Sequence, residues 1–251
     1  MGLKESGLRG SLRNVSVGID AIPDSVELQY SATTFSNSDS VWADDAGNVD
    51  MNINGDPQKA TLSDGSESIS SDGSNDSGEI EMPSTLEGSG LTEFSFEFVI
   101  EHTDTNDPVA VTGSRNSSGG QFFNVLLNRD VQGNTDLGNM NVQHDDDSGN
   151  RLSFGPSTNP NLDDGNRHDI SVIIHDSTIN DVEIIIDGVS VDLSFTDQDG
   201  PNQFTTWNNS MATFARNLDG TLQLRANIEL GAVRWHTSGI MSQTISEYPF
   251  D

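Results

Sequence analysis

Two short runs of Asp and Asn are the residues of this sequence best suited to chemistry. One run contains Asp104, Asn106 and Asp107, and the other contains Asp197 and Asp199 with a glycine directly after them. Hard cations such as Ca²⁺ take several carboxylate, amide and carbonyl oxygens on a flexible loop as ligands. In a chain with this many acidic residues, we expect these loops to be solvated and to bind salt cations loosely. Calcium ligation by the same residues is the alternative.

A second candidate site is aromatic. Sugar rings bind to exposed aromatic side chains that have polar groups beside them. Trp207 lies in the polar stretch QFTTWNNS, next to Asn208 and Asn209, and we predict these three residues as a glycan-binding site. The other two tryptophans, Trp42 and Trp235, are expected in the core.

The sequence contains no recognisable catalytic motif. It has no Cys, which excludes disulfides, zinc–thiolate sites and cysteine nucleophiles. Ser, His and Asp occur without a Gly-x-Ser-x-Gly elbow, and there is no His-x-x-x-His pair, Walker A loop or Gly-x-Gly-x-x-Gly stretch. These absences favour a protein that is not an enzyme.

Acidic residues dominate the charge. The 251 residues include 40 Asp and Glu against 11 Lys and Arg, which gives a formal net charge of −29. Phosphate backbones are bound by clustered Lys and Arg, so this balance argues against a nucleic-acid partner. Such a charge repels itself in dilute buffer, whereas the Debye length falls to about 3 Å at 1 M salt. The composition therefore indicates a halophilic protein, with an acidic mesophilic protein as the alternative.

The first thirteen residues differ from the rest of the chain. They hold Lys4, Arg9 and Arg13 against Glu5, and we predict that they form a basic arm that docks on another acidic protein. A frayed terminus is the alternative. The stretch has no apolar core of the kind that signal peptides contain, and no apolar run in the sequence approaches the roughly 20 residues of a membrane span.

The elements that position these residues are almost all strands. Apolar residues alternate at period 2 or cluster in β-branched runs between Gly, Asn, Asp and Pro, and Asp187-Gly188 predicts a hairpin. The ranges with a strand pattern are 26–30, 79–82, 94–100, 108–113, 121–128, 152–154, 170–174, 182–186, 189–193, 222–226 and 228–235. Segment 61–78 is predicted as loop and 241–248 as one helical turn.

Four stretches, taken in order, resemble laminin-G-like domains of the concanavalin A-like lectin and glucanase jelly rolls. They are 78–101, 166–191, 212–237 and 245–248. His168 stands where that family often has a Trp-His pair, with Arg167 in place of the Trp. The resemblance implies an all-β fold, an antiparallel β-sandwich jelly roll, over residues 41–251, preceded by an N-terminal docking arm or anchor segment over residues 1–40.

The glucanase branch of this family carries alternating carboxylates on one strand, in a Glu-x-Asp-x-x-Glu arrangement. This sequence contains no such triplet: Glu79 and Glu81 alternate but supply only two acids, on a strand that we expect at a sheet edge. Glu93 and Glu97 are expected to point to solvent. Because the carboxylate pattern of the glucanases is not matched, the resemblance implies no catalytic residue in this sequence.

The opening MGLKESGLRGSLRNVSVG resembles that of structural proteins from tailed viruses of haloarchaea. This implies a non-enzymatic protein of the virion surface, such as a capsid turret, a decoration protein or a tail fibre. It would assemble in the host cytoplasm as a trimer or pentamer and contact host surface glycans or S-layer glycoprotein, without membrane insertion. The alternatives are a purely structural decoration protein and a secreted haloarchaeal glycan-active enzyme.

Overall fold

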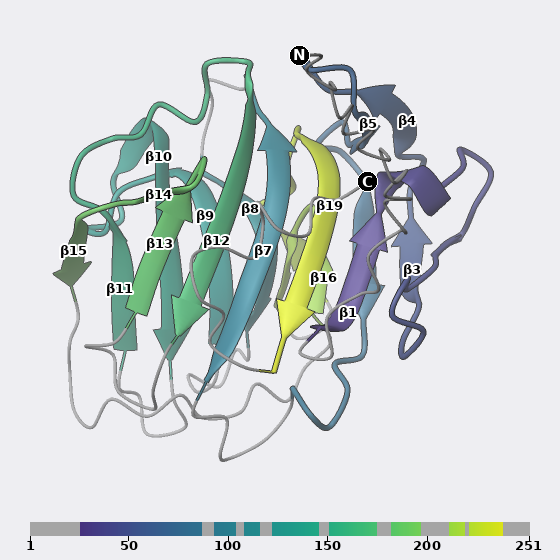
Figure 1. Cartoon of the computed structure of the whole chain (residues 1–251), viewed down its shortest axis with the longest axis horizontal. Coiled ribbons are helices and arrows are strands. Elements are labelled where there is room, and N and C mark those ends of the chain that lie inside the picture. Colours follow the sequence, from purple (N-terminus) through teal and green to yellow (C-terminus); the bar gives the residue numbers. More distant parts are fainter. Residues whose placement is uncertain are drawn as a thin grey trace, which may run out of the picture.

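The computed structural model is a sandwich of two β-sheets (Figure 1). It describes residues 26–86, 93–103, 108–115, 122–145, 151–174, 182–196, 211–218 and 221–237. Strand pairing among these residues is antiparallel throughout, except that β17 runs parallel to β8. The predicted all-β sandwich is thereby confirmed.

The first sheet, which we call sheet A, faces the viewer in Figure 1. From one edge to the other its strands are β14 (Val189–Ser190), β13 (Val182–Ile186), β12 (Arg167–Ile174), β7 (Phe94–Glu101), β19 (Glu229–His236), β5 (Glu67–Ser70) and β4 (Gln58–Thr61). A further strand, β1 (Val26–Ser31), pairs with the second half of β19, while β5 pairs with the first half.

The second sheet, sheet B, lies behind sheet A in Figure 1. Its strand order is β15 (Leu193–Thr196), β11 (Arg151–Pro156), β10 (Thr135–Asp145), β9 (Phe122–Arg129), β8 (Val109–Arg115), β16 (Met211–Thr213), β6 (Ser77–Ile80), β3 (Met51–Asn54) and β2 (Val41–Trp42). The ribbon of β17 (Arg216–Leu218) and β18 (Thr221–Gln223) attaches to β8.

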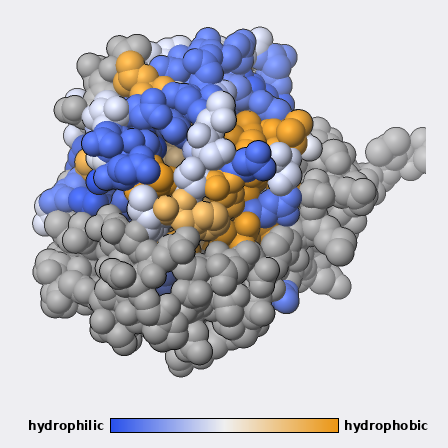
Figure 2. All heavy atoms as spheres, turned by 90° about the vertical axis from the view of Figure 1, so that its left-hand side faces the viewer, coloured by the Kyte–Doolittle hydropathy of each residue, from blue (hydrophilic) through white to orange (hydrophobic). Residues whose placement is uncertain are grey.

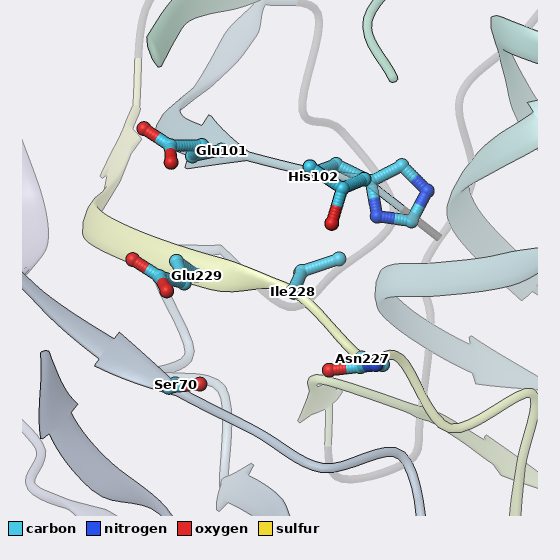
Figure 3. A pocket seen from close by; sticks show the side chains of 7 residues that line it. Ser70, Glu101, His102, Asn227, Ile228 and Glu229 are labelled. Carbon is cyan, nitrogen blue, oxygen red and sulfur yellow. The ribbon is translucent and has the colours of Figure 1, made fainter. Parts of the chain in front are cut away.

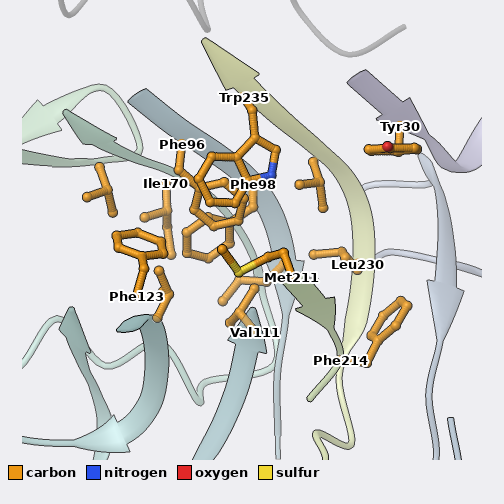
Figure 4. Packing of buried hydrophobic residues seen from close by; sticks show 14 of the residues in the cluster. Tyr30, Phe96, Phe98, Val111, Phe123, Ile170, Met211, Phe214, Leu230 and Trp235 are labelled. Carbon is orange, nitrogen blue, oxygen red and sulfur yellow. The ribbon is translucent and has the colours of Figure 1, made fainter. Parts of the chain in front are cut away.

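Aromatic side chains fill the space between the sheets (Figure 4). Phe94, Phe96 and Phe98 alternate along β7, so all three point to the same face and are fully buried. The ring of Trp235 lies 4.3 Å from that of Phe96, measured between centroids. Trp42 is also fully buried, and its Nε1 donates to the carbonyl of Ser31 at 2.8 Å. The core predicted from the alternation is confirmed.

The end of the sandwich that carries β14 and β15 keeps apolar groups at its surface (Figure 2). Val189 is 64% exposed, and Leu193 and Phe195 are only partly buried against the core. These residues belong to the edge strands β14 and β15, each of which pairs with a neighbour on one side only.

Several strand predictions are wrong in detail. Segment 61–78 was predicted as loop but contains β5, because Ile69 is buried and pairs with Leu230 of β19. The eleven-residue β10 was not predicted. Strand β6, which carries Glu79, lies between β16 and β3 and is not a sheet edge. The helical turn predicted at 241–248 lies outside the described residues.

The N-terminal boundary of the sandwich lies earlier than residue 41. Strand β1 and the short 3-10 helix η1 (Ala32–Thr34) fall within the 1–40 segment that the sequence assigned to the arm, yet Leu28 and Tyr30 are completely buried in the common core. The basic residues of the arm, Lys4, Arg9 and Arg13, lie outside the described residues. Within the described ranges, no helix has the length and apolar character that a membrane crossing requires.

Candidate functional site

Charged and polar side chains cross the outer face of sheet A in two rows. Because Phe94, Phe96 and Phe98 point into the core, the alternate residues of β7, which include Glu97 and Glu101, point to the opposite face. Strand pairing sets Glu97 opposite Arg234 and Ser171, and Glu101 opposite Glu229 and Arg167. The first row runs through the middle of the sheet, and the second follows its rim.

The middle row is a buried ionic cluster centred on Glu97. His236 Nε2 lies 2.8 Å from Glu97 Oε2, and Arg234 Nη1 lies 3.4 Å from the same oxygen. Ser171 Oγ donates to Oε1 at 3.3 Å, and Arg234 Nε donates to Gln29 Oε1 at 2.9 Å. Glu97 is completely buried, so the expectation that it points to solvent is wrong: it faces away from the core on a covered surface.

Burial has an electrostatic consequence for this cluster. It lowers the pKa of the Arg234 guanidinium, and the negative charge of Glu97 opposes that shift. An ion pair that is removed from water contributes stability only when its hydrogen bonds are satisfied. The cluster is therefore suited to fixing the register of β7, β12, β19 and β1 rather than to binding a ligand.

The rim row contains a small pocket of about 80 Å³ between β5, β7 and β19 (Figure 3). Its polar lining comes from Glu101, His102 and Thr103 on one side and from Ser70, Asn227 and Glu229 on the other. Figure 3 shows both carboxylates at one end of the pocket and the amide of Asn227 at the other. These groups can accept and donate hydrogen bonds to a polar ligand.

Each carboxylate of the pocket is held by one neighbour. Glu101 Oε2 accepts the backbone N–H of Ser63 at 2.6 Å, and Glu229 Oε2 accepts the hydroxyl of Ser68 at 3.1 Å. Burial raises the pKa of the Glu229 carboxyl, and the negative charge of Glu101 raises it further, although the Ser68 hydrogen bond opposes both. The second oxygen of each carboxylate receives no hydrogen bond from the described residues and is available to a donor.

Arg167 closes the rim beside Glu101. Its guanidinium contacts Asp64 at 2.5 Å and Asp169 at 2.9 Å. The pKa of the Asp64 carboxyl falls to about 2 because Ser66 donates two hydrogen bonds to it and Arg167 adds a third. Arg167 is thus committed to two carboxylates, and the pocket keeps a negative potential.

The next residue of β12 forms a second charged contact. His168 Nδ1 lies 2.8 Å from Asp187 Oδ2, and His168 Nε2 lies 3.2 Å from Asp164 Oδ1. The hydrogen bond to Asp187 raises the pKa of His168 while burial opposes the shift, and the pKa values of both carboxyls are lowered. His168 therefore connects the predicted hairpin at Asp187-Gly188 to the turn that precedes β12.

The structure leaves the site residues predicted from the sequence untested. Trp207, Asn208 and Asn209 lie outside the described residues, as do the candidate calcium ligands Asp104, Asn106, Asp107, Asp197 and Asp199. Across the described ranges, no group of three or more His, Asp or Glu side chains is arranged to hold a metal ion. The glycan and calcium sites therefore stay predictions.

Sequence reasoning missed the pocket and the contacts of His168. Glu101 and Glu229 are far apart in the sequence, and only the register of β7 against β19 brings them together. The contact between His168 and Asp187 left a readable signal. Antiparallel pairing of 170–174 with 182–186, both predicted strands, places residue 168 beside the Asp-Gly turn.

No protein-family model matches the chain, and no curated protein sequence matches it. Solved structures do share its fold. The binding domain of Paraclostridial Mosquitocidal Protein 1 matches with a TM-score of 0.66 at 13% identity, over 89% of this chain and 51% of that one. A structure of botulinum neurotoxin type C, whose cell entry depends on interaction with two ganglioside molecules, matches with a TM-score of 0.61 at 11% identity, over 89% and 50%.

A third similar structure is close to this chain in size. It is domain 4 of AbnA, a GH43 extracellular arabinanase from Geobacillus stearothermophilus, in complex with arabinotriose, with a TM-score of 0.59 and 14% identity over 89% of this chain and 97% of that domain. The present chain spans about half of the length of the two toxin structures. At these identities the similarity establishes the fold, which is the β-sandwich of these binding domains.

Proposed function

We propose that the protein is a non-enzymatic, glycan-binding module on the surface of a haloarchaeal tailed virus. The observation that carries the glycan-binding part is that the whole sandwich matches domain 4 of the arabinanase, a domain of the same size that holds arabinotriose. The ganglioside dependence of botulinum neurotoxin type C, which shares the fold, supports the same function. The virion part rests on the resemblance of the N-terminal segment and on the acidity of the chain.

The pocket at the rim of sheet A is the proposed contact for the sugar. The available oxygens of Glu101 and Glu229 would accept hydrogen bonds from sugar hydroxyls, and the Asn227 amide would donate and accept at the other end. Trp207, with Asn208 and Asn209, stays the predicted stacking group. Calcium or loosely bound salt cations at the predicted Asp loops are a further part of this proposal.

The direct test measures binding of labelled protein to haloarchaeal cells in about 2 M salt, where charge repulsion is screened. An acidic halophilic protein of another fold serves as the control. Saturable binding that free glycans or S-layer glycoprotein compete away supports the proposal. Absence of binding above the control, for a protein that is present on the particle, would leave the capsid decoration role instead.

Variants locate the binding site. Asn227→Ala should weaken binding by about two- to thirteenfold, because one hydrogen bond contributes about 0.5–1.5 kcal/mol. Asn52→Ala is the matched control, since Asn52 is also exposed but lies on β3 of sheet B. Equal binding by both variants would remove the pocket from the proposal, and unchanged binding by Trp207→Ala would remove the stacking site.

The arm and the assembly are part of the same proposal. Lys4, Arg9 and Arg13 would dock on another acidic virion protein, and an anchored homo-oligomer would raise weak sugar contacts to firm adhesion through avidity. Deletion of residues 1–13 should reduce incorporation into particles and leave the melting temperature of the sandwich unchanged. Incorporation at the wild-type level would refute the docking role.

A further inference from the structure

His168 has an ionised carboxylate at each of its two ring nitrogens. Nδ1 faces Asp187 at 2.8 Å and Nε2 faces Asp164 at 3.2 Å. An ionised carboxylate can only accept hydrogen bonds, and a neutral imidazole has one donor, so both contacts form together only when the ring carries two protons. The side chain of His168 is 10% exposed, whereas those of Asp164 and Asp187 are 29% and 50% exposed, so a lost contact leaves the ring nitrogen less accessible to water than the carboxylate.

Apart from Asp164 and Asp187, no neighbouring group among the described residues balances the positive charge of protonated His168. Arg167 and Asp169 flank it on β12 and bind each other. On β7 the residue opposite is Ile100, which is buried and apolar. The charge of the ring is therefore balanced by Asp164 and Asp187 among the described residues.

Each of the two carboxylates belongs to a tight turn. Asp187 has a φ of +51° and Gly188 a φ of +77°, the backbone conformation of a type I′ hairpin. The second oxygen of Asp187 accepts the backbone N–H of Asp169 at 2.9 Å. Asp164 lies in the segment 162–166 before β12, where its Oδ1 also accepts the N–H of Asn166.

Segment 162–166 forms part of the surroundings of the pocket. The N–H of Gly165 donates to the carbonyl oxygen of His102 at 3.1 Å. A Cβ at Gly165 would lie 3.0 Å from the Thr103 methyl group, so the backbone of this turn packs directly on Thr103. His102 and Thr103 both line the pocket. A change in the position of this turn therefore reaches the wall of the pocket.

We propose that protonated His168 is a clamp that holds segment 162–166 and the Asp187 hairpin against β12, and that the clamp fixes one wall of the pocket. Loss of the proton releases one of the two carboxylates, loosens the turn at Gly165 and weakens ligand binding at the pocket. The second half of this inference rests on the proposed glycan-binding function, and the first half does not.

The direction of the pH dependence follows from the charges. A histidine with a raised pKa stabilises the folded state fully below its unfolded value of about 6.5, and this contribution is lost as pH rises through the folded pKa. The lowered pKa values of Asp164 and Asp187 add stability above about pH 4 that is lost on acidification. The clamp is thus strongest between about pH 4 and 6.5.

NMR titration of the five histidines tests the clamp without any ligand. His168→Gln identifies the signal, which should titrate above about 6.5 in the wild type. Asp187→Asn should lower that pKa and keep the hairpin, because Asn tolerates positive φ. Asp169→Asn is the matched control: it removes a neighbouring carboxylate that does not contact His168. An ordinary pKa, or equal shifts in both Asn variants, would overturn the clamp.

Hydrogen exchange and binding test the connection to the pocket. The protection factor of the Gly165 amide should fall as pH rises through the His168 pKa, about tenfold for each unit by which that pKa exceeds its unfolded value, and His168→Gln should abolish this dependence. Constant protection overturns the clamp. If the protection factor of the Gly165 amide changes with pH but the affinity of the protein for cells does not, the connection between the clamp and the pocket is refuted. If the wild-type protein shows the clamp in both experiments but binds no glycan, only the proposed function is refuted.

Discussion

Replacing Glu97 by Leu should lower the free energy of unfolding by about 3–5 kcal/mol, the range found when one partner of a buried ion pair is removed. The side chain of Glu97 is 1% exposed, and those of Arg234 and His236 are 2% and 0% exposed. Leu has a similar volume, so the variant removes the charge without opening a large cavity.

The magnitude follows from the contacts of the carboxylate. It accepts from His236 at 2.8 Å, from Arg234 at 3.4 Å and from Ser171 at 3.3 Å. Each hydrogen bond to a charged group is worth about 1.5–3 kcal/mol, and part of the sum is offset because the carboxylate itself no longer has to be dehydrated. A loss of this size is a large fraction of the roughly 5–15 kcal/mol that stabilises a typical domain.

Urea unfolding in about 2 M salt, followed by tryptophan fluorescence, measures the loss by linear extrapolation. Adding Arg234→Met and His236→Leu to the Glu97 variant should recover most of it, because an apolar cluster of similar volume replaces the ionic one. A loss below about 1 kcal/mol, the typical worth of an exposed pair, would refute a dehydrated cluster. So would a triple variant that is no more stable than the single one.

Three further changes have defined outcomes. Gly113→Ala should cost about 1–3 kcal/mol in a denaturation curve, because the added Cβ would overlap Oδ1 of Asn124 and lie 3.1 Å from Cγ of Arg216; adding Asn124→Ala should restore part of the loss, and no restoration would contradict the overlap. Glu229→Gln should raise the melting temperature at about pH 7 and not at about pH 4, since the raised pKa of Glu229 means that its ionised form destabilises the fold; an equal effect at both pH values would refute this electrostatic reasoning. The melting temperature of the wild type should rise from dilute buffer to about 2 M salt as the charge of −29 is screened, and greater stability in dilute buffer would refute the halophilic assignment.

Local sequence patterns were sufficient for the central strands. The period-2 stripe of β7 and the branched runs of β12 and β13 predict buried strands because each residue type favours both the conformation and the burial. Strand β10 shows where this fails. Its sequence TDLGNMNVQHD mixes Asn, Gly and Asp with a few apolar residues, a composition typical of loops. Pairing with β9 and β11 on both sides overrides that preference.

The arrangement of charges depended on contacts between distant strands. Alternation indicates that Glu97 and Glu101 point away from the core, but it does not say whether that face is covered or which charges lie opposite. The register of β19 against β7 decided which charges lie opposite, by setting Arg234 beside Glu97 and Glu229 beside Glu101, and the burial of Glu97 shows that the face is covered there.

The fold class, the aromatic core and the Asp-Gly hairpin could be predicted from local sequence, because they follow from alternation and turn chemistry over a few neighbouring residues. The tertiary structure was needed to establish the buried cluster at Glu97, the pocket at Glu101 and Glu229 and the contact of His168 with Asp164. Here the side chains that meet across β7 and β19 belong to strands far apart in the chain. A shift of one residue in pairing exchanges every one of those contacts.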